Sequence, residues 1–204
     1  RGFAGGMNFA MKWLMSHRQF DFYLLLNNDA FMTTGSLNKL ITVSTKNSDA
    51  CLVAPSHLGQ NNPSRIWYQK TFGLVSKKKV PGAFPYLSGC CLLIPKNLAR
   101  DRFFDEDFFM YGEDLDLCYR IKKAVWKIYY VHSTKVIHYK GESVRRSDID
   151  EVKVFYEAMR LFVRKHYRAN IFTTGLLGIG ITLRQWMASL GRSSKTVLSV
   201  LIDV

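Results

Sequence analysis

The sequence predicts an α/β layered domain, and three observations indicate this class. Two apolar runs, residues 22–26 and 50–54, each end at turn-forming residues, as strands buried on both faces of a parallel sheet do. Residues 36–46 between them can form the crossover helix. The chain has 204 residues and is 48% hydrophobic, enough for one full core plus an appendage and too apolar for a disordered polypeptide. Functional loops are then expected at the carboxyl ends of the strands.

The other elements of this domain follow from hydrophobic spacing and turn residues. A glycine-rich stretch, residues 2–6, opens a helix over residues 7–17. Residues 57–85 are rich in Asn, Gly, Lys and Pro and predict a long excursion or a short hairpin over the active face. The elements expected after it are a strand at 86–94, a helix from 113 to about 124, strands at 127–131 and 135–139, and an amphipathic helix at 150–168.

The carboxyl-terminal tail differs in character from the domain. Residues 169–183 carry no charge and mix large apolar residues with glycine and threonine. A membrane-spanning helix needs roughly 20 apolar residues, so we expect a core or interfacial helix flanked by Arg168 and Arg184. It could pack on the domain, on a second subunit of a homo-oligomer, or on an anionic membrane surface. We therefore divide the chain into a domain at 1–148 and a helical extension at 149–204.

Charge and cysteine content narrow the functional classes. The 29 Lys and Arg residues exceed the 16 Asp and Glu residues by 13, which predicts attraction to nucleic acid, anionic lipid or phosphate-bearing substrates. The four cysteines show no C-x-x-C spacing, so neither a zinc knuckle nor a disulfide framework is indicated. We expect them to be buried small hydrophobic residues in a protein of a reducing compartment.

A cluster of acids stands out in this basic chain. Residues 101–120 hold seven of the sixteen acidic residues, and Glu113, Asp114 and Asp116 fall in the first turn of a predicted helix. The helix dipole stabilises acids there by about 0.3–1 kcal/mol each, which is the structural alternative. Three acids exceed what capping requires. Glu113 and Asp116 share a helix face while Asp114 points elsewhere, so one acid can orient a substrate and another can act as a general base.

Asp29 and His138 are candidate metal ligands. Each follows an apolar run, so both side chains are expected at the carboxyl end of a strand. A carboxylate together with a neutral imidazole suits Mn²⁺. Arg145 and Arg146, just beyond, could neutralise a diphosphate. The alternatives are an ordinary turn at Asp29, a core histidine and a solvated surface loop.

Two glycine-containing segments are candidate ligand contacts. Gly5, Gly6 and Asn8 stand at the start of the first helix, where backbone N–H groups can bind an anion. Ser88 and Gly89 stand in the expected strand at 86–94, where a substrate could lie against the backbone or the glycine could mark a bulge.

Taken together, these residues resemble the family-two glycosyltransferases of the GT-A fold, especially bacterial rhamnosyltransferase-like members that build surface polysaccharides. The resemblance covers residues 1 to about 146. Six segments in this order carry it: Gly2-Phe3-Ala4-Gly5-Gly6, Leu24-Leu25-Leu26-Asn27-Asn28-Asp29, Ser88-Gly89-Cys90, Phe104-Asp105-Glu106-Asp107-Phe108-Phe109, Gly112-Glu113-Asp114-Leu115-Asp116-Leu117-Cys118-Tyr119-Arg120 and Val136-Ile137-His138.

The resemblance implies a GT-A-like, Rossmann-like, mostly parallel sheet whose amino-terminal strands would lie upstream of residue 1. It also implies that Asn27-Asn28-Asp29 stands at the D-x-D metal motif, with Asn27 beside the donor in place of the first Asp. Asp29 and His138 would hold Mn²⁺ or Mg²⁺ against the donor diphosphate. Asp114 would take the proton of the acceptor hydroxyl in a single displacement that inverts configuration.

The resemblance also implies which residues contact the acceptor. The acceptor would lie beside Ser88, Gly89, Glu113 and Asp116. Three further positions depart from the family pattern: Met7 replaces an Asn, Val125 a Gly and His132 a Pro.

The leading hypothesis is therefore a metal-dependent inverting glycosyltransferase. It would move a sugar, with rhamnose as one candidate, from a nucleotide-diphosphate donor to a glycan or polyprenyl-linked acceptor at the inner face of the cell membrane, without a nucleic-acid partner. One alternative is a nucleotidyltransferase, which would release pyrophosphate but should show a glycine-rich basic loop. Another is a non-catalytic basic module that binds nucleic acid or a lipid surface, for which residues 67–70, with adjacent aromatic and basic side chains, are the main support.

Overall fold

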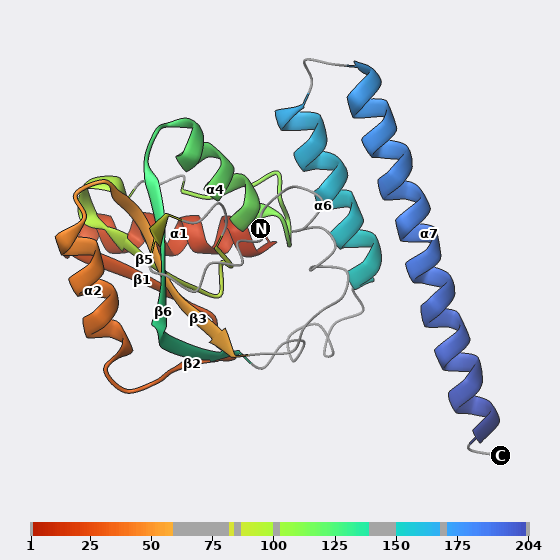
Figure 1. The fold of residues 1–204 in the computed structure, drawn as a ribbon, viewed down its shortest axis with the longest axis horizontal. Helices are drawn as coiled ribbons and strands as arrows, with labels where there is room; N and C mark the ends of the chain where they lie inside the picture. The colour runs from red at the N-terminus through yellow and green to blue at the C-terminus, as the bar shows by residue number, and fades with distance from the viewer. Residues whose placement is uncertain are drawn as a thin grey trace.

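The structure is a computed structural model, and it describes residues 2–58, 82–83, 87–99, 103–138, 150–167 and 171–202. Helices and strands alternate along most of this length (Figure 1). In chain order the elements are α1 (Gly2–His17), β1 (Phe22–Leu26), β2 (Ala30–Met32), α2 (Ser36–Lys46), β3 (Ala50–Leu58), β4 (Gly82–Ala83), β5 (Cys91–Pro95), a 3₁₀ turn η1 (Lys96–Leu98), α4 (Glu113–Lys123), β6 (Lys127–His138), α6 (Glu151–His166) and α7 (Ile171–Ile202).

The described strands form one mixed sheet in the order β1-β5-β3-β6-β2, with β4 also paired to β6. The central pair β3 and β6 is parallel, whereas β1 with β5, β3 with β5, β2 with β6 and β4 with β6 are antiparallel. The predicted α/β class is therefore confirmed, but "mostly parallel" describes only the centre of the sheet. The difference arises because β5 lies between β1 and β3 and runs antiparallel to both, and because β2 and β4 run antiparallel to β6.

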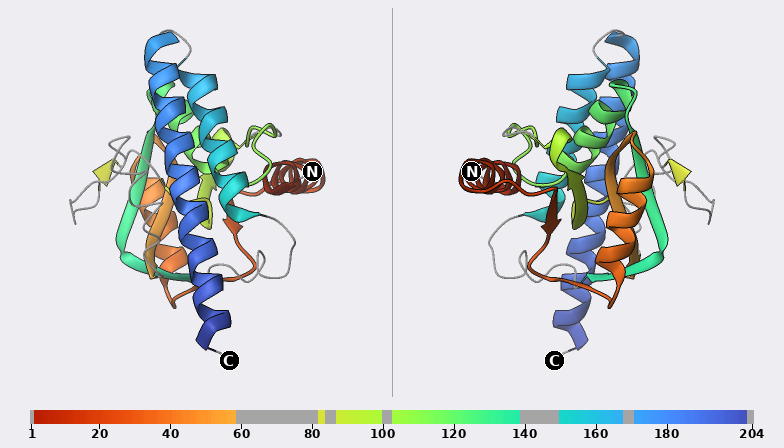
Figure 2. Two further views of the ribbon diagram at one scale, coloured as in Figure 1. Left: turned by 90° about the vertical axis from the view of Figure 1, so that its right-hand side faces the viewer. Right: turned by 90° about the vertical axis from the view of Figure 1, so that its left-hand side faces the viewer.

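Helices cover both faces of the sheet. On one face α1 and α4 pack through Met11 and Leu117 against alternate strand residues such as Leu25. On the other face Leu40 of α2 packs against Val53 and its neighbours. Both patterns follow from the period of two along a strand, which sends successive side chains to opposite faces. The result is a three-layer domain with its strand ends free to carry polar residues (Figure 2).

The helix limits reflect local capping chemistry. The predicted crossover helix at 36–46 is confirmed as α2, which begins after Gly35 in the left-handed region. The N-cap of α4 is Gly112, at φ +78°, where a Cβ would meet the Phe108 ring at 3.1 Å. Helix α6 starts at a side-chain cap, because Asp150 accepts hydrogen bonds from the Val152 and Lys153 N–H groups.

The helical extension consists of α6 and α7, which pack as an antiparallel pair (Figure 1). The predicted apolar stripe of α6 is confirmed, since Tyr156, Met159, Phe162 and Val163 are buried. This stripe packs on Phe108 and on Leu115 of α4, so α6 shares a core with the domain. None of the helices in the described ranges combines the length and hydropathy needed to cross a membrane.

Three expectations from the sequence need correction. Helix α1 begins at Gly2, so the glycine-rich stretch is its first turns and not a loop; Ala4 and Gly5 are buried there and allow close packing. The strands expected at 127–131 and 135–139 are one strand, β6, with an irregularity where β3 shifts register. The strand expected at 86–94 is shorter, because Gly89 and Cys90 form a turn before β5.

Candidate functional site

Asp29 and His138 meet at the end of the sheet. The turn after β1 closes with a hydrogen bond from the Ala30 N–H to the Asn27 carbonyl, 3.1 Å. Strand β2 then pairs Ala30 with His138, the last residue of β6. This pairing places Asp29 Oδ1 3.1 Å from His138 Nε2, and Asn27 Nδ2 lies 3.5 Å from the same ring nitrogen. Two residues 109 positions apart in the chain are thus brought together by sheet register.

Asp114 and Gly89 form a second contact at the start of α4. The Gly89 N–H donates to Asp114 Oδ2 at 3.0 Å, and the Leu115 N–H donates to Oδ1 at 2.8 Å. A Cβ on residue 89 would lie 3.3 Å from Asp114 Cβ and 3.8 Å from Glu113 Oε1, so glycine permits this close approach. The Asp114 carboxylate is thus held by two backbone N–H groups, one on each oxygen.

The two contacts belong to one site, because residues 89 and 90 join them. Cys90 follows Gly89 directly, and its carbonyl accepts a hydrogen bond from the Asn27 N–H at 2.9 Å. Asn27 in turn lies next to the pair of Asp29 and His138. The predicted metal ligands, the predicted base and the predicted acceptor contacts Ser88 and Gly89 therefore share one edge of the sheet.

The pair of Asp29 and His138 fits two neighbouring ligands of one octahedral ion. Donor atoms about 2.1 Å from such an ion are about 3.0 Å apart in adjacent positions, close to the observed 3.1 Å. A carboxylate oxygen and an imidazole nitrogen are donors that Mn²⁺ accepts. Within the described residues no three His, Cys, Asp or Glu side chains gather into a metal-binding cluster.

Asp116 lies on the other side of the same helix and is almost fully buried, with 1% exposure. Its Oδ2 accepts from Arg120 Nε at 2.7 Å, and its Oδ1 lies 2.7 Å from His166 Nε2 on α6. Arg120 also donates to the Phe103 carbonyl at 2.9 Å. In the structure this carboxylate is bound inside the protein by Arg120 and His166, where the sequence predicted an acceptor contact. His166 was not identified from the sequence, because no local pattern signals its contact with Asp116.

Two of the three predicted donor contacts at the amino terminus, Gly5 and Asn8, lie within the protein interior. The Asn8 side chain donates to the Phe104 carbonyl and accepts from the Phe104 N–H, both at 2.8 Å, and so anchors the segment that precedes α4. Gly5 is buried in α1, and Gly6 lies on its exposed side with no atom within 4 Å of its Cβ position. Arg145 and Arg146 lie outside the described residues.

A second link holds α6 against the segment before α4. Lys165 Nζ contacts Asp105 Oδ2 at 2.5 Å and Asp107 Oδ2 at 2.6 Å. Partial burial disfavours the charge on Asp105, but the hydrogen bonds from Lys165 and from the Asp107 N–H outweigh it and lower the pKa of Asp105. The pair of Asp105 and Lys165 was not expected from the sequence.

The four cysteines are free and buried, as expected. Burial, with a smaller contribution from neighbouring Cys90, raises the pKa of Cys91 to about 12. Burial also raises the pKa of Cys118 well above its usual range. Thiolates are therefore scarce at neutral pH, and these residues contribute packing and not nucleophilic chemistry.

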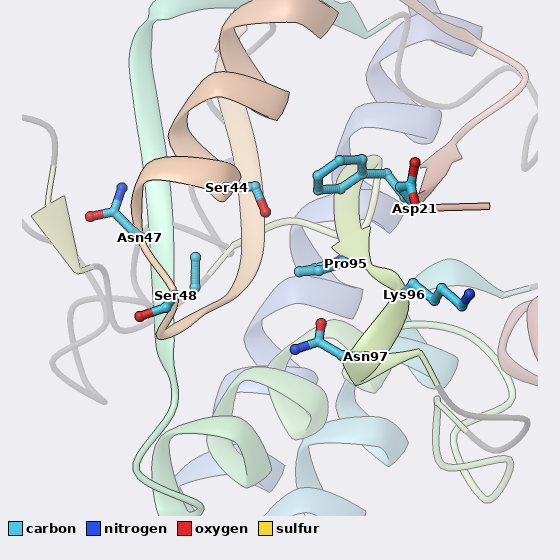
Figure 3. Close-up of a pocket in the computed structure, with 9 residues that line it drawn as sticks. Asp21, Ser44, Asn47, Ser48, Pro95, Lys96 and Asn97 are labelled. Atoms are coloured by element: carbon cyan, nitrogen blue, oxygen red, sulfur yellow. The ribbon is translucent and has the colours of Figure 1, made fainter.

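A pocket of about 420 Å³ lies at the opposite end of the sheet (Figure 3). Asp21 and Phe22 line it at the start of β1, together with Pro95 at the end of β5 and Ser44 of α2. The five residues of β1 separate it from Asn27 by about 17 Å along the strand. The pocket is therefore separate from the carboxylates described above.

The order of strands, the helices on both faces and the polar strand ends define an α/β fold of the GT-A type. The crystal structure of GalNAc-T7 with UDP, GalNAc and Mn²⁺ matches 80% of this chain and 34% of that one, with a TM-score of 0.53 and 14% sequence identity. At that identity the likeness concerns the fold alone, and it confirms the predicted fold class.

Two curated proteins are also similar to part of this chain in sequence. These two, both named N-acetylglucosaminyl-diphospho-decaprenol L-rhamnosyltransferase and from Mycobacterium tuberculosis strains CDC 1551 / Oshkosh and ATCC 25618 / H37Rv, are 37% identical to this chain over 79 residues. The match covers 38% of this chain, and the chain spans about a quarter (26%) of the length of these relatives. No protein-family model matches the chain.

Proposed function

We propose that this chain carries the catalytic edge of a metal-dependent glycosyltransferase that moves a sugar from a nucleotide-diphosphate donor to a hydroxyl of a lipid-linked glycan, with inversion. One observation carries the proposal: the carboxylate and imidazole of Asp29 and His138 and the carboxylate of Asp114 are joined through residues 89 and 90 at one edge of a GT-A sheet. The similarity to two rhamnosyltransferases supports rhamnose as the sugar and a polyprenyl-diphosphate glycan as the acceptor.

Asp29 and His138 would hold the divalent ion, Mn²⁺ or Mg²⁺, and bound there it would stabilise negative charge on the departing diphosphate. Asn27, beside the His138 ring, would orient the donor. Arg145 and Arg146 remain the proposed cations for the same diphosphate. This set would bind the donor with its leaving group against the end of β1.

Asp114 would act on the acceptor. Its Oδ2 is fixed by the Gly89 N–H, so the carboxylate is oriented before substrate arrives. It would accept the proton of the attacking hydroxyl as that oxygen bonds to the anomeric carbon and the sugar–phosphate bond breaks. Ser88, Gly89 and Glu113, which surround it, would bind the acceptor. Because one displacement occurs on the face opposite the leaving group, the product would have inverted configuration.

We assign positioning roles to Asn8 and Asp116 in place of the ligand contacts expected from the sequence. Both use their side chains inside the protein, and each fixes a segment next to Glu113 or Asp114. Gly5 would serve the same end by letting α1 pack closely.

The proposal is tested by incubating the full chain with Mn²⁺ or Mg²⁺, a panel of nucleotide-diphosphate sugars that includes rhamnose, and N-acetylglucosaminyl-diphospho-polyprenol. We expect a glycosylated lipid product of inverted anomeric configuration and loss of activity with a chelator. Asp29→Asn should abolish metal-dependent donor binding, measured by calorimetry, whereas Asp114→Asn should retain it. Release of pyrophosphate in place of a nucleoside diphosphate would refute the proposal in favour of nucleotidyl transfer.

A further inference from the structure

Helix α7 carries a stripe of large apolar side chains that no described segment covers. The stripe residues recur at intervals of three and four, which puts them on one side of the helix. Their exposed fractions are between about half and two thirds, high for side chains of this size. They are Leu176 (62%), Ile179 (61%), Leu183 (58%), Trp186 (64%), Met187 (50%) and Leu190 (49%), and we call them the α7 stripe.

The opposite side of α7 packs on α6, so the direction of the stripe is fixed. Ile181 is buried in the core shared with α6, and Leu177 and Ala188 pack beside it. Arg160 of α6 donates to Gln185 Oε1 at 2.7 Å and adds a polar contact to this packing. Figures 1 and 2 show α7 as the outermost helix, with α6 between it and the sheet. The stripe therefore faces away from the protein.

The polar groups of α7 near the stripe are few, and the hydroxyls among them do not need contact with water. Between residues 176 and 190 the helix has a single charged residue, Arg184, which lies off the stripe. The hydroxyls of Thr182 and Ser189 donate to carbonyls of their own helix, at Gly178 (2.9 Å) and Gln185 (3.1 Å). Hydroxyls satisfied in this way need no water, as in helices that lie in lipid.

We propose that the α7 stripe inserts into the surface of an anionic membrane and holds the protein there. A second copy of the helix is less suitable, because helix pairs are specified by charged residues beside the seam, and positions beside this stripe include the uncharged Gly180, Thr182 and Ser189. The excess of 13 positive charges in the chain complements anionic headgroups. This inference rests on the proposed function, which places the acceptor on a lipid carrier.

The geometry is that of a helix lying in the plane of the interface. From residue 176 to 190 the stripe extends about 21 Å, and such helices are buried by about 5–10 Å at the boundary of headgroups and acyl chains. Trp186 is the residue type enriched at that depth.

The experiment measures co-sedimentation of the full chain with vesicles of phosphatidylcholine alone and with vesicles containing about 30% phosphatidylglycerol. We expect binding to the anionic vesicles, reduced at least about tenfold in Trp186→Glu and in Ile179→Lys, two variants with opposite changes of charge. Trp13→Glu is the matched control: Trp13 is also an exposed tryptophan (53%) but lies on α1, so binding should be nearly unchanged. Thermal unfolding checks that all variants are folded.

Three outcomes would overturn the proposal. Binding of the unaltered chain could be absent, the control variant could lose as much binding as the stripe variants, or the stripe variants could bind normally. If Trp186→Glu instead turns a dimer into a monomer in light scattering without changing vesicle binding, the stripe is a dimer interface. The vesicle assay contains no sugar donor or acceptor, so its result does not depend on whether the proposed transfer reaction occurs.

Discussion

The two sides of the first turn of α4 hold acids of the same kind in opposite circumstances. The backbone N–H groups of Gly89 and Leu115 donate to Asp114. Asp116, two residues later, is held between the cationic side chain of Arg120 and the ring of His166. The first carboxylate is oriented by backbone donors, whereas the second joins α4 to α6 through side chains. Both carboxylates are buried, so burial does not distinguish them. The chemical nature of their partners does.

The largest effect is expected from Asp114→Asn. The amide oxygen can still accept the Gly89 hydrogen bond, so the fold and donor binding should be kept, but the proton acceptor is lost. Turnover should fall about 10²- to 10⁴-fold with little change in donor affinity. Steady-state transfer rates and calorimetric donor binding measure the two quantities. Full activity in this variant would move the base to another residue.

The reverse pattern is expected from Asp116→Ala. Removing this buried carboxylate leaves Arg120 and His166 without their shared partner, and leaving buried hydrogen-bonding groups unsatisfied costs about 1–3 kcal/mol of the free energy of unfolding. Urea unfolding measures the loss, with Asp107→Ala as a control because that side chain is 68% exposed. If both variants lose equally little, the ion pairs do not hold α4 to α6.

A smaller and pH-dependent effect is expected from Lys165→Met. The variant loses the contacts with Asp105 and Asp107, at a cost of about 1 kcal/mol for partly exposed pairs. Because the folded pKa of Asp105 lies below its ordinary 3.8, the stabilisation is present above that pH and is lost as pH falls through the folded value. The difference in the free energy of unfolding between variant and parent should therefore be larger at pH 7 than at pH 3, as measured by unfolding curves at both pH values. A pH-independent difference would point to packing of the lysine stem.

The smallest effect is a gain, from Val125→Gly. Val125 adopts φ +65° after α4 and is 89% exposed, so a β-branched side chain is strained there without burying surface. Glycine should raise the free energy of unfolding by about 1 kcal/mol. Thermal and urea unfolding check this, and Val125→Ala should recover less. A loss of stability would show that the Val125 backbone is not strained.

The positions of the main candidate site residues could be predicted from the sequence, but their long-range partners could not, for a physical reason. Polar residues after apolar runs correctly indicated that Asp29 and His138 stand at strand ends, and acids at a helix start drew attention to Asp114. The short strand β2, which sets their contact, has only three residues and no alternation to detect. The partner of Asp116 lies 50 residues away on another helix, and no local pattern encodes such a pairing.

The position of Asp116 has a consequence for the helical extension. Through His166 it connects α6 to the same turn that presents Asp114, and Phe108 and Leu115 share their core with that helix. A chain shortened at residue 148 would therefore lose two contacts next to the candidate active site: the apolar packing of α6 on Phe108 and Leu115, and the contact of His166 with Asp116. Because α7 packs on α6, and α6 contacts Asp116, the surface that α7 presents is one helix away from a residue two positions after the proposed base.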